Sequence, residues 1–134
     1  MPTNVRQFNR AVTKFAETML PYQVKLFTKK VALDTLTRIV RKTPVDTGRA
    51  RGNWQITINT ASESEVNNVA GSGISDVVSQ GRVALENMEP FSIVFISNNV
   101  PYIAYLEQGS SSQAPQGMVA TTIEEMNQIF ARIV

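Results

Sequence analysis

The sequence contains no cysteine and no histidine. Without cysteine the chain forms no disulfide, no thiolate metal site and no thiol redox centre. Without histidine it lacks the commonest general base and the commonest metal ligand. Catalysis would have to rely on carboxylates, lysine or tyrosine. These two absences therefore argue against an enzyme and against a bound metal or cofactor.

Long apolar runs are also missing. No stretch approaches the roughly 20 apolar residues that span a bilayer. The N-terminal segment MPTNVRQFNRAV lacks the apolar region of a signal peptide. We therefore expect a protein that stays in the cytoplasm of the cell that makes it and has no membrane partner. The 134 residues, 43% of them hydrophobic and 18% charged, predict a single folded domain over residues 1–134.

Charge is distributed unevenly along the chain. Residues 1–52 contain eleven Lys and Arg and three acidic residues, a net charge of +8. Residues 53–134 contain two Lys and Arg and eight acidic residues, a net charge of −6. This asymmetry indicates a basic surface for a polyanion, a head-to-tail contact between copies, or pairing of the two halves within one fold. The basic residues proposed to contact DNA or another subunit are Arg6, Arg10, Lys14, Lys25, Lys29 and Lys30.

Periodicity predicts two long helices at the N-terminus. Apolar residues recur at steps of three and four: Val5, Phe8, Val12, Phe15 and Met19. They form one face of an amphipathic helix that reaches about Leu20. Pro21 either ends this helix or begins the next one, since proline suits a first helical turn. The second helix runs to Lys42 and has a wide apolar face, which predicts contacts on two sides.

The remaining chain predicts strands and shorter helices. Residues 53–59 alternate apolar and polar side chains, and residues 91–97 are rich in β-branched and aromatic residues, so both predict strands. Residues 74–89 are ambiguous and fit a helix interrupted at Gly81. A short helix over residues 102–108 and a long one from about residue 117 follow. The fold class is α+β: long N-terminal helices, a small, mainly antiparallel sheet and a packing C-terminal helix.

The predicted loops offer no catalytic arrangement. Residues 44–52 and 60–72 read as surface loops, and residues 110–116 as a flexible polar loop. The closest imitation of a phosphate-binding loop, Gly71-Ser72-Gly73, lacks the following lysine and a preceding strand, so we interpret it as a hinge. Asp46 and Glu107 have no acid–base partner in the sequence, which leaves a hydrolase as the least favoured hypothesis.

Two segments stand out from the scaffold. The first, TPVDTG, spans Thr43–Gly48. The second spans Pro101–Gly109 and continues over Gln113–Met118. The first also fits a helix stop with a tight turn, and the second a glycine-capped short helix with a surface loop. The residues that carry the two segments are Thr43, Pro44, Val45, Asp46, Thr47, Gly48, Tyr102, Tyr105, Leu106, Glu107, Gly109, Ser111, Gln113, Ala114, Pro115 and Gly117.

In this order and spacing, the two segments resemble the neck and minor tail proteins of long-tailed bacteriophages. In that family a TPVDTG turn follows a long N-terminal helix, and a Y…Y…LE.G.S.QAP.G segment precedes a C-terminal helix. The resemblance covers roughly residues 20–134 of this chain. Residues 1–20 lie outside it and form an N-terminal extension.

The resemblance implies a structural virion protein of the head–tail junction, made in the host cytoplasm. Such a subunit completes the neck or tail, joins tail to head and helps to form the DNA channel. Its expected partners are copies of itself in a ring, a hexamer or a dodecamer, together with the neighbouring connector, tail-tube and terminator proteins. Genomic DNA in the channel is a further possible contact, and no cofactor is implied.

Three questions stay open at the level of sequence. A tail-terminator ring that caps the tail tube has a similar size and fold class, although the motifs favour the neck role. A DNA-binding module of another class would use the basic N-terminal half, and its DNA affinity would fall steeply with salt. Tyr102 and Tyr105 are candidate interface anchors, but they fit equally well in a core.

Overall fold

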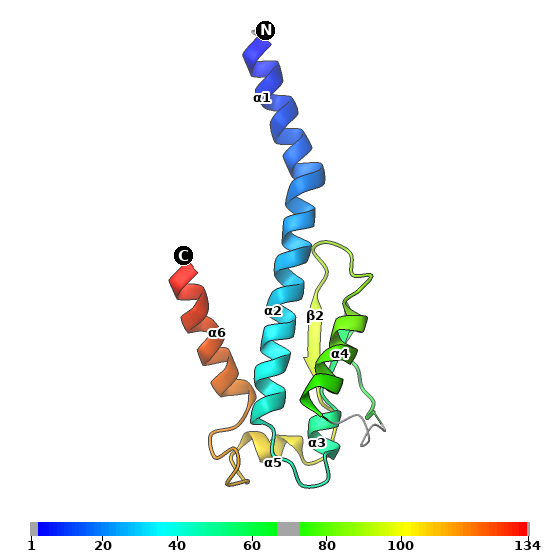
Figure 1. Ribbon diagram of the computed structural model, residues 1–134, viewed down its shortest axis with the longest axis vertical. Coiled ribbons are helices and arrows are strands. Elements are labelled where there is room, and N and C mark those ends of the chain that lie inside the picture. Colours follow the sequence, from blue (N-terminus) through cyan, green and yellow to red (C-terminus); the bar gives the residue numbers. More distant parts are fainter. Residues whose placement is uncertain (1–2, 67–72, 134) are drawn as a thin grey trace.

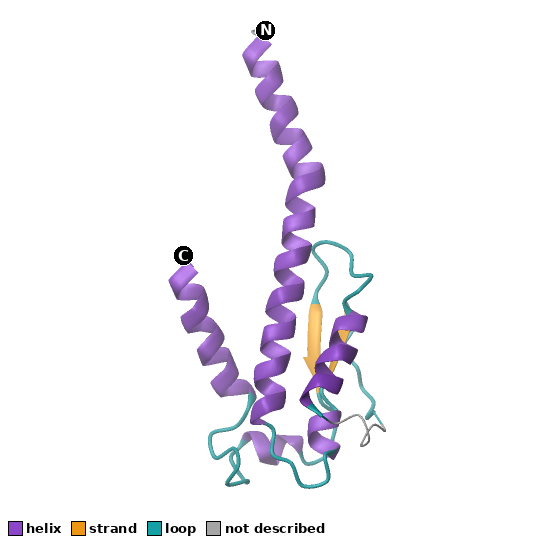
Figure 2. Cartoon of the chain, in the orientation of Figure 1, coloured by secondary structure: helices purple, strands orange, loops and turns teal. Residues whose placement is uncertain are grey.

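The computed structural model describes residues 3–66 and 73–133 of the chain. Its axis is one long helix, which begins as α1 (Thr3–Lys14), continues through the π-helical turn η1 (Phe15–Met19) and ends as α2 (Leu20–Lys42). The rest of the chain folds around the C-terminal part of this axis, so α1 extends beyond the body (Figure 1). Helices make up most of the structure (Figure 2), in agreement with the predicted α+β class.

The long helix passes through Pro21 without a break. Proline has no N–H to donate, and its ring crowds the carbonyl four residues back. The turn before it is π-helical, and the Leu20 N–H bonds to the carbonyl of Phe15, five residues back. This wider turn accommodates Pro21 in the first turn of α2. The predicted boundary between two helices is thus a change in helical geometry within one helix.

Two layers cover opposite sides of α2. α6 (Val119–Ile133) lies on one side, and α4 (Ile74–Ala84) lies with the sheet on the other (Figure 1). The short helices α3 (Arg49–Gly52) and α5 (Ile103–Glu107) lie at the end of the body near the C-terminus of α2. The predicted C-terminal and short helices are confirmed, and α3 adds a helical turn to the loop predicted after Pro44.

The sheet consists of β1 (Gln55–Ile58) and β2 (Val94–Ser97), which pair antiparallel with Gln55 opposite Ser97 and Ile58 opposite Val94. Both strands are shorter than predicted. Phe91 has φ +65°, which is outside the extended region, so β2 cannot begin there. The predicted alternation in β1 is confirmed, because Ile56 is buried in the core.

α4 runs through Gly81, where the sequence predicted an interruption. A Cβ atom on Gly81 would lie 2.6 Å from Cδ2 of Leu36 and 3.1 Å from Cδ1 of Ile56. The glycine therefore lets α4 approach α2 and β1 closely. The prediction of a break was wrong, because this glycine serves packing.

The core lies where α2, α4 and β1 meet, and it extends beneath α5. Its members come from α2, from β1 and the residue before it, from α4 and the turn after it, and from the loop before α6: Ala32, Leu36, Ile39, Val40, Trp54, Ile56, Val77, Leu85, Met88, Ala114 and Met118. Only the C-terminal half of α2 contributes, whereas Tyr22, Leu26 and Phe27 in its first turns are exposed. The predicted two-sided contact of this helix thus holds for its second half.

Some predictions fall on residues that the structure does not describe. Residues 67–72 of the predicted loop, and with them Gly71 and Ser72 of the predicted hinge, lie outside the described residues. Within the described ranges, no helix combines the length and apolar character that crossing a bilayer requires.

Candidate functional site: a cleft shared by the two motifs

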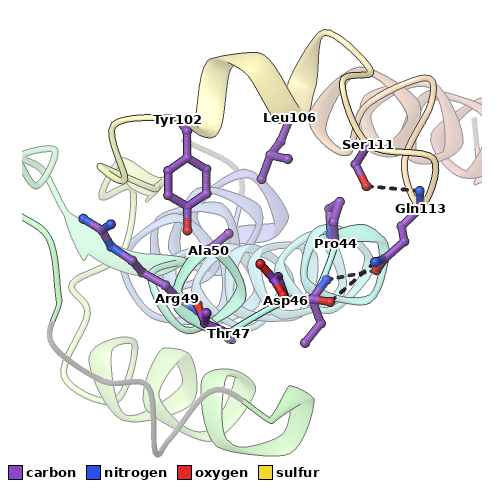
Figure 3. Close-up of a pocket in the computed structure, with 11 residues that line it drawn as sticks. Pro44, Asp46, Thr47, Arg49, Ala50, Tyr102, Leu106, Ser111 and Gln113 are labelled. Atoms are coloured by element: carbon purple, nitrogen blue, oxygen red, sulfur yellow. Dashed lines mark hydrogen bonds between the residues drawn. The ribbon is translucent and has the colours of Figure 1, made fainter.

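The two sequence segments meet at one cleft (Figure 3). TPVDTG follows the C-terminus of α2, while α5 and the loop after it form the opposite wall. The cleft has a volume of about 470 Å³. It is lined by Pro44, Val45, Asp46, Thr47, Gly48, Arg49, Ala50, Tyr102, Leu106, Ser111 and Gln113.

Thr43, the first residue of TPVDTG, is buried and holds the cleft to the core. Its hydroxyl donates to the carbonyl of Ile39 over 2.7 Å and accepts the indole N–H of Trp54 over 2.8 Å. The threonine therefore joins the last turn of α2 to the residue that precedes β1. This motif position is structural.

Replacing Thr43 by valine should lower the free energy of unfolding by about 1–3 kcal/mol, because the Trp54 N–H would stay buried without an acceptor. Trp54 is the single tryptophan, so urea unfolding followed by its fluorescence measures the change. Thr43→Ser keeps the hydroxyl and is the matched control. Equal stability of the valine and serine variants would show that this hydrogen bond contributes little.

Gln113 ties the second segment to the first. Its side-chain oxygen accepts the N–H of Val45 over 3.0 Å, and its side-chain N–H donates to the carbonyl of Val45 over 3.4 Å (Figure 3). Next to it, Ala114 is buried. The hydrogen bonds of Gln113 connect the loop over residues 110–116, which the sequence predicts to be flexible, to a backbone segment far away in the chain.

Glu107 caps the N-terminus of α6. Its carboxylate accepts the backbone N–H groups of Met118, Val119 and Ala120 over 2.8–3.0 Å. These N–H groups have no partner within the helix, and the positive end of the helix dipole favours an anion there. Burial raises the pKa of Glu107, but the three N–H donors outweigh burial and hold the pKa below its ordinary value.

Two glycines of the second segment permit close backbone approaches. Gly109 and Gly117 have φ +93° and +83°, a region that other residues rarely adopt. A Cβ on Gly109 would collide with the carbonyl of Pro115, and one on Gly117 with the carbonyl of Glu107. Much of the second segment therefore shapes the loop between α5 and α6.

Arg49 forms the charged wall of the cleft. Its guanidinium makes a bidentate ion pair with Glu65 and lies 5.6 Å from the ring centre of Tyr102. The hydrogen bonds between the two side chains raise the pKa of Arg49 and lower that of Glu65. The half-buried ring of Tyr102 and the guanidinium of Arg49 are therefore adjacent parts of the cleft wall.

The cleft presents few free chemical groups. Val45, Asp46 and Thr47 are exposed on its first wall, and Tyr105 is exposed on the neighbouring face of α5. Asp46 is the single carboxylate in the lining, and the single guanidinium, that of Arg49, is already paired. Such a surface offers hydrogen bonds and apolar contact to another chain. It does not offer an acid–base pair.

The charge asymmetry is partly resolved by pairing within the fold. Arg38 and Lys42 on α2 bind Glu125 on α6 over 2.7 and 2.5 Å, and Lys42 also donates to Thr122. The pKa of Glu125 is lowered by these hydrogen bonds. By contrast, the basic residues in the N-terminal part have no ion pair with any described residue: Arg6, Arg10, Lys14, Lys25, Lys29 and Lys30.

In the part of the chain that the structure describes, no group of three or more acidic side chains is arranged to hold a metal ion. Comparisons of the chain with protein-family models, curated proteins and solved structures each found no match.

Proposed function

We propose that this chain is a structural, non-enzymatic subunit of the head–tail junction of a long-tailed bacteriophage. In this role it completes the neck or tail as one copy in a ring, joins tail to head and helps to form the DNA channel. The cleft is the docking site for a neighbouring protein of the junction.

One observation carries this proposal. The two segments that resemble the neck and minor tail family are separated by residues 49–100, yet they line one cleft. Thr43, Gln113 and Glu107 hold the walls in place, while the side chains of Val45 and Asp46 stay exposed. A fixed cleft with an exposed rim supports a role in protein–protein contact, because docking surfaces are commonly preformed.

Replacing Val45 by glutamate should reduce infectious particles of the encoding phage on the order of tenfold or more, since a charge in a docking site removes apolar contact. The substitution leaves the backbone bonds of Val45 to Gln113 available. Electron microscopy of lysates should show separate heads and tails. Ser79→Glu is the matched control, because Ser79 is exposed on α4 and does not line the cleft.

Location distinguishes the related roles. A reconstruction of finished particles should contain the chain in several copies at the head–tail junction, as cyclic symmetry requires. Its presence only as a cap on the end of the tail tube would assign it to the tail terminator. Absence from particles, with normal infectivity of Val45→Glu, would contradict the proposed function.

A further inference from the structure

The N-terminal extension exposes an apolar stripe that no described part of its own chain covers. Figure 1 shows α1 extending beyond the body, with neither α6 nor the sheet beside it. The stripe consists of Val5, Phe8, Val12, Phe15 and Met19, whose exposed fractions range from 38% to 67%. Soluble proteins rarely leave so continuous an apolar face in water, so the stripe marks an interaction surface.

The spacing of the stripe is that of a coiled-coil seam. Its members follow one another at steps of three, four, three and four residues, which is the pattern of the two core positions of a heptad. The positions that flank such a seam are Asn4, Asn9, Ala11, Ala16 and Thr18. All five are uncharged, so no like charges oppose a second identical helix along the seam.

The basic residues of α1 lie on the opposite face. Arg10 is two residues from both Phe8 and Val12, which places it about 200° around the helix from each. Arg6 and Lys14 lie one turn to either side of Arg10. Two copies of α1 that pair through the stripe would therefore keep these cations in solvent, away from each other.

We propose that this stripe, which runs along α1 and η1, is the seam of a parallel coiled coil formed with α1 and η1 of a second copy of this chain. The inference rests on the proposed function for its direction, because helices that run along the axis of a closed cyclic ring all point the same way. The short seam benefits from helix continuity: α2 is fixed in the body and already nucleates the helix that α1 extends.

Disulfide trapping tests the pairing and its direction. The chain has no cysteine, so Val12→Cys introduces one thiol at a seam position, where parallel helices bring identical residues together. Oxidation of the purified full-length variant should give a linked dimer as the main product on a non-reducing gel. Arg10→Cys, on the opposite face of the same helix, should give several-fold less linked dimer.

Sedimentation equilibrium measures the strength of the contact. Phe8→Glu/Phe15→Glu should raise the dissociation constant of the full-length protein roughly a hundredfold, since each charge would enter an apolar seam. Arg6→Glu/Arg10→Glu introduces the same charges on the opposite face. This variant should change the dissociation constant by no more than about threefold. Both pairs lie on an exposed helix outside the core, so the body remains folded.

The inference would be overturned if the wild-type protein stayed monomeric at all concentrations, or if Val12→Cys gave no more linked dimer than Arg10→Cys. It would also be overturned if Phe8→Glu/Phe15→Glu left the dissociation constant unchanged. Binding of the monomer to phosphatidylserine vesicles, lost in Phe8→Glu/Phe15→Glu, would instead assign the stripe to a lipid surface. Pairing by a chain that is absent from the head–tail junction would keep this contact and remove the proposed function. A chain that is present at the head–tail junction but does not pair through α1 would keep the proposed function and remove this contact.

Discussion

Replacing Leu36 by alanine is expected to lower the free energy of unfolding by about 3 kcal/mol, within a range of about 2–5 kcal/mol for such changes in a core. Leu36 is fully buried where α2 packs against α4 and β1. Alanine would leave a cavity that the surrounding helices can only partly close. Chemical unfolding followed by circular dichroism and by Trp54 fluorescence measures the loss.

The effect should depend on Gly81, which faces Leu36 across the helix contact. Gly81→Ala alone should destabilise by about 1 kcal/mol, because steric overlap with the leucine outweighs the gain in helix propensity. In the Leu36→Ala background the added methyl enters the cavity. The double variant should therefore be about 1 kcal/mol more stable than the sum of the single changes predicts.

A double-mutant cycle decides whether the two positions are in direct contact. Val83→Ala is the matched control on α4, because Val83 is exposed and lies away from Leu36 in the core. Its effect should add to that of Leu36→Ala. Simple additivity of Gly81→Ala with Leu36→Ala would show that α4 does not approach α2 as closely as the structure places it.

Replacing Glu107 by alanine should lower the free energy of unfolding by about 2 kcal/mol, since hydrogen bonds to a charged acceptor contribute about 1.5–3 kcal/mol. The substitution leaves the first N–H groups of α6 without their acceptor. It also loosens the loop that carries Gln113, so the cleft should lose its fixed shape. Hydrogen exchange at the N-terminus of α6 and in residues 110–116 should accelerate.

The same group predicts a pH dependence. The pKa of Glu107 is lower in the folded protein than its ordinary value of 4.5. The stability it contributes is therefore complete above the unfolded value and is lost as the pH falls through the folded value. Glu107→Gln should be less stable than the wild type near neutral pH, and the difference should shrink in acid, where both side chains are neutral.

Glu124→Gln provides the control, because Glu124 is exposed on α6 and bonds to no described residue. It should leave the acid transition almost unchanged. Glu65 and Glu125 also have lowered pKa values, so part of the acid sensitivity will remain in every variant. A gap between wild type and Glu107→Gln that is constant from neutral to acid pH would contradict the capping role.

The sequence predicts the elements of this fold well where the signal is local. Steps of three and four residues in the first helix mark one apolar face, and alternation around Ile56 marks a strand with one buried face. Neither pattern requires knowledge of distant partners. Gly81 shows the limit of such reasoning. Its effect depends on Leu36 and Ile56, which are far away in the chain, so a glycine that permits packing looked like one that ends a helix.

The candidate site shows the same difference between local and long-range information. The two motif segments can be identified from the sequence, but the roles of their residues cannot. Glu107 looked like an isolated carboxylate because its three donors lie at the start of a helix that begins twelve residues later. Gln113 looked like part of a mobile loop because its partner, Val45, lies on the other segment. Arg49 and Glu65 form an ion pair although β1 lies between them in the sequence, and no local pattern predicts this pairing.

The π-helical turn η1 has a geometric consequence for anything that holds α1. One turn of α-helix takes about 3.6 residues, so each residue advances the chain by about 100° around the axis. A turn that contains one residue more offsets the azimuth of the seam relative to that of Leu36 and Val40. Since the helix is continuous, α1 and the body rotate as one rod. Deleting Glu17 would keep Val5, Phe8, Val12 and Phe15 of the seam and would turn the cleft by about 100° around the helix axis, toward a different neighbour.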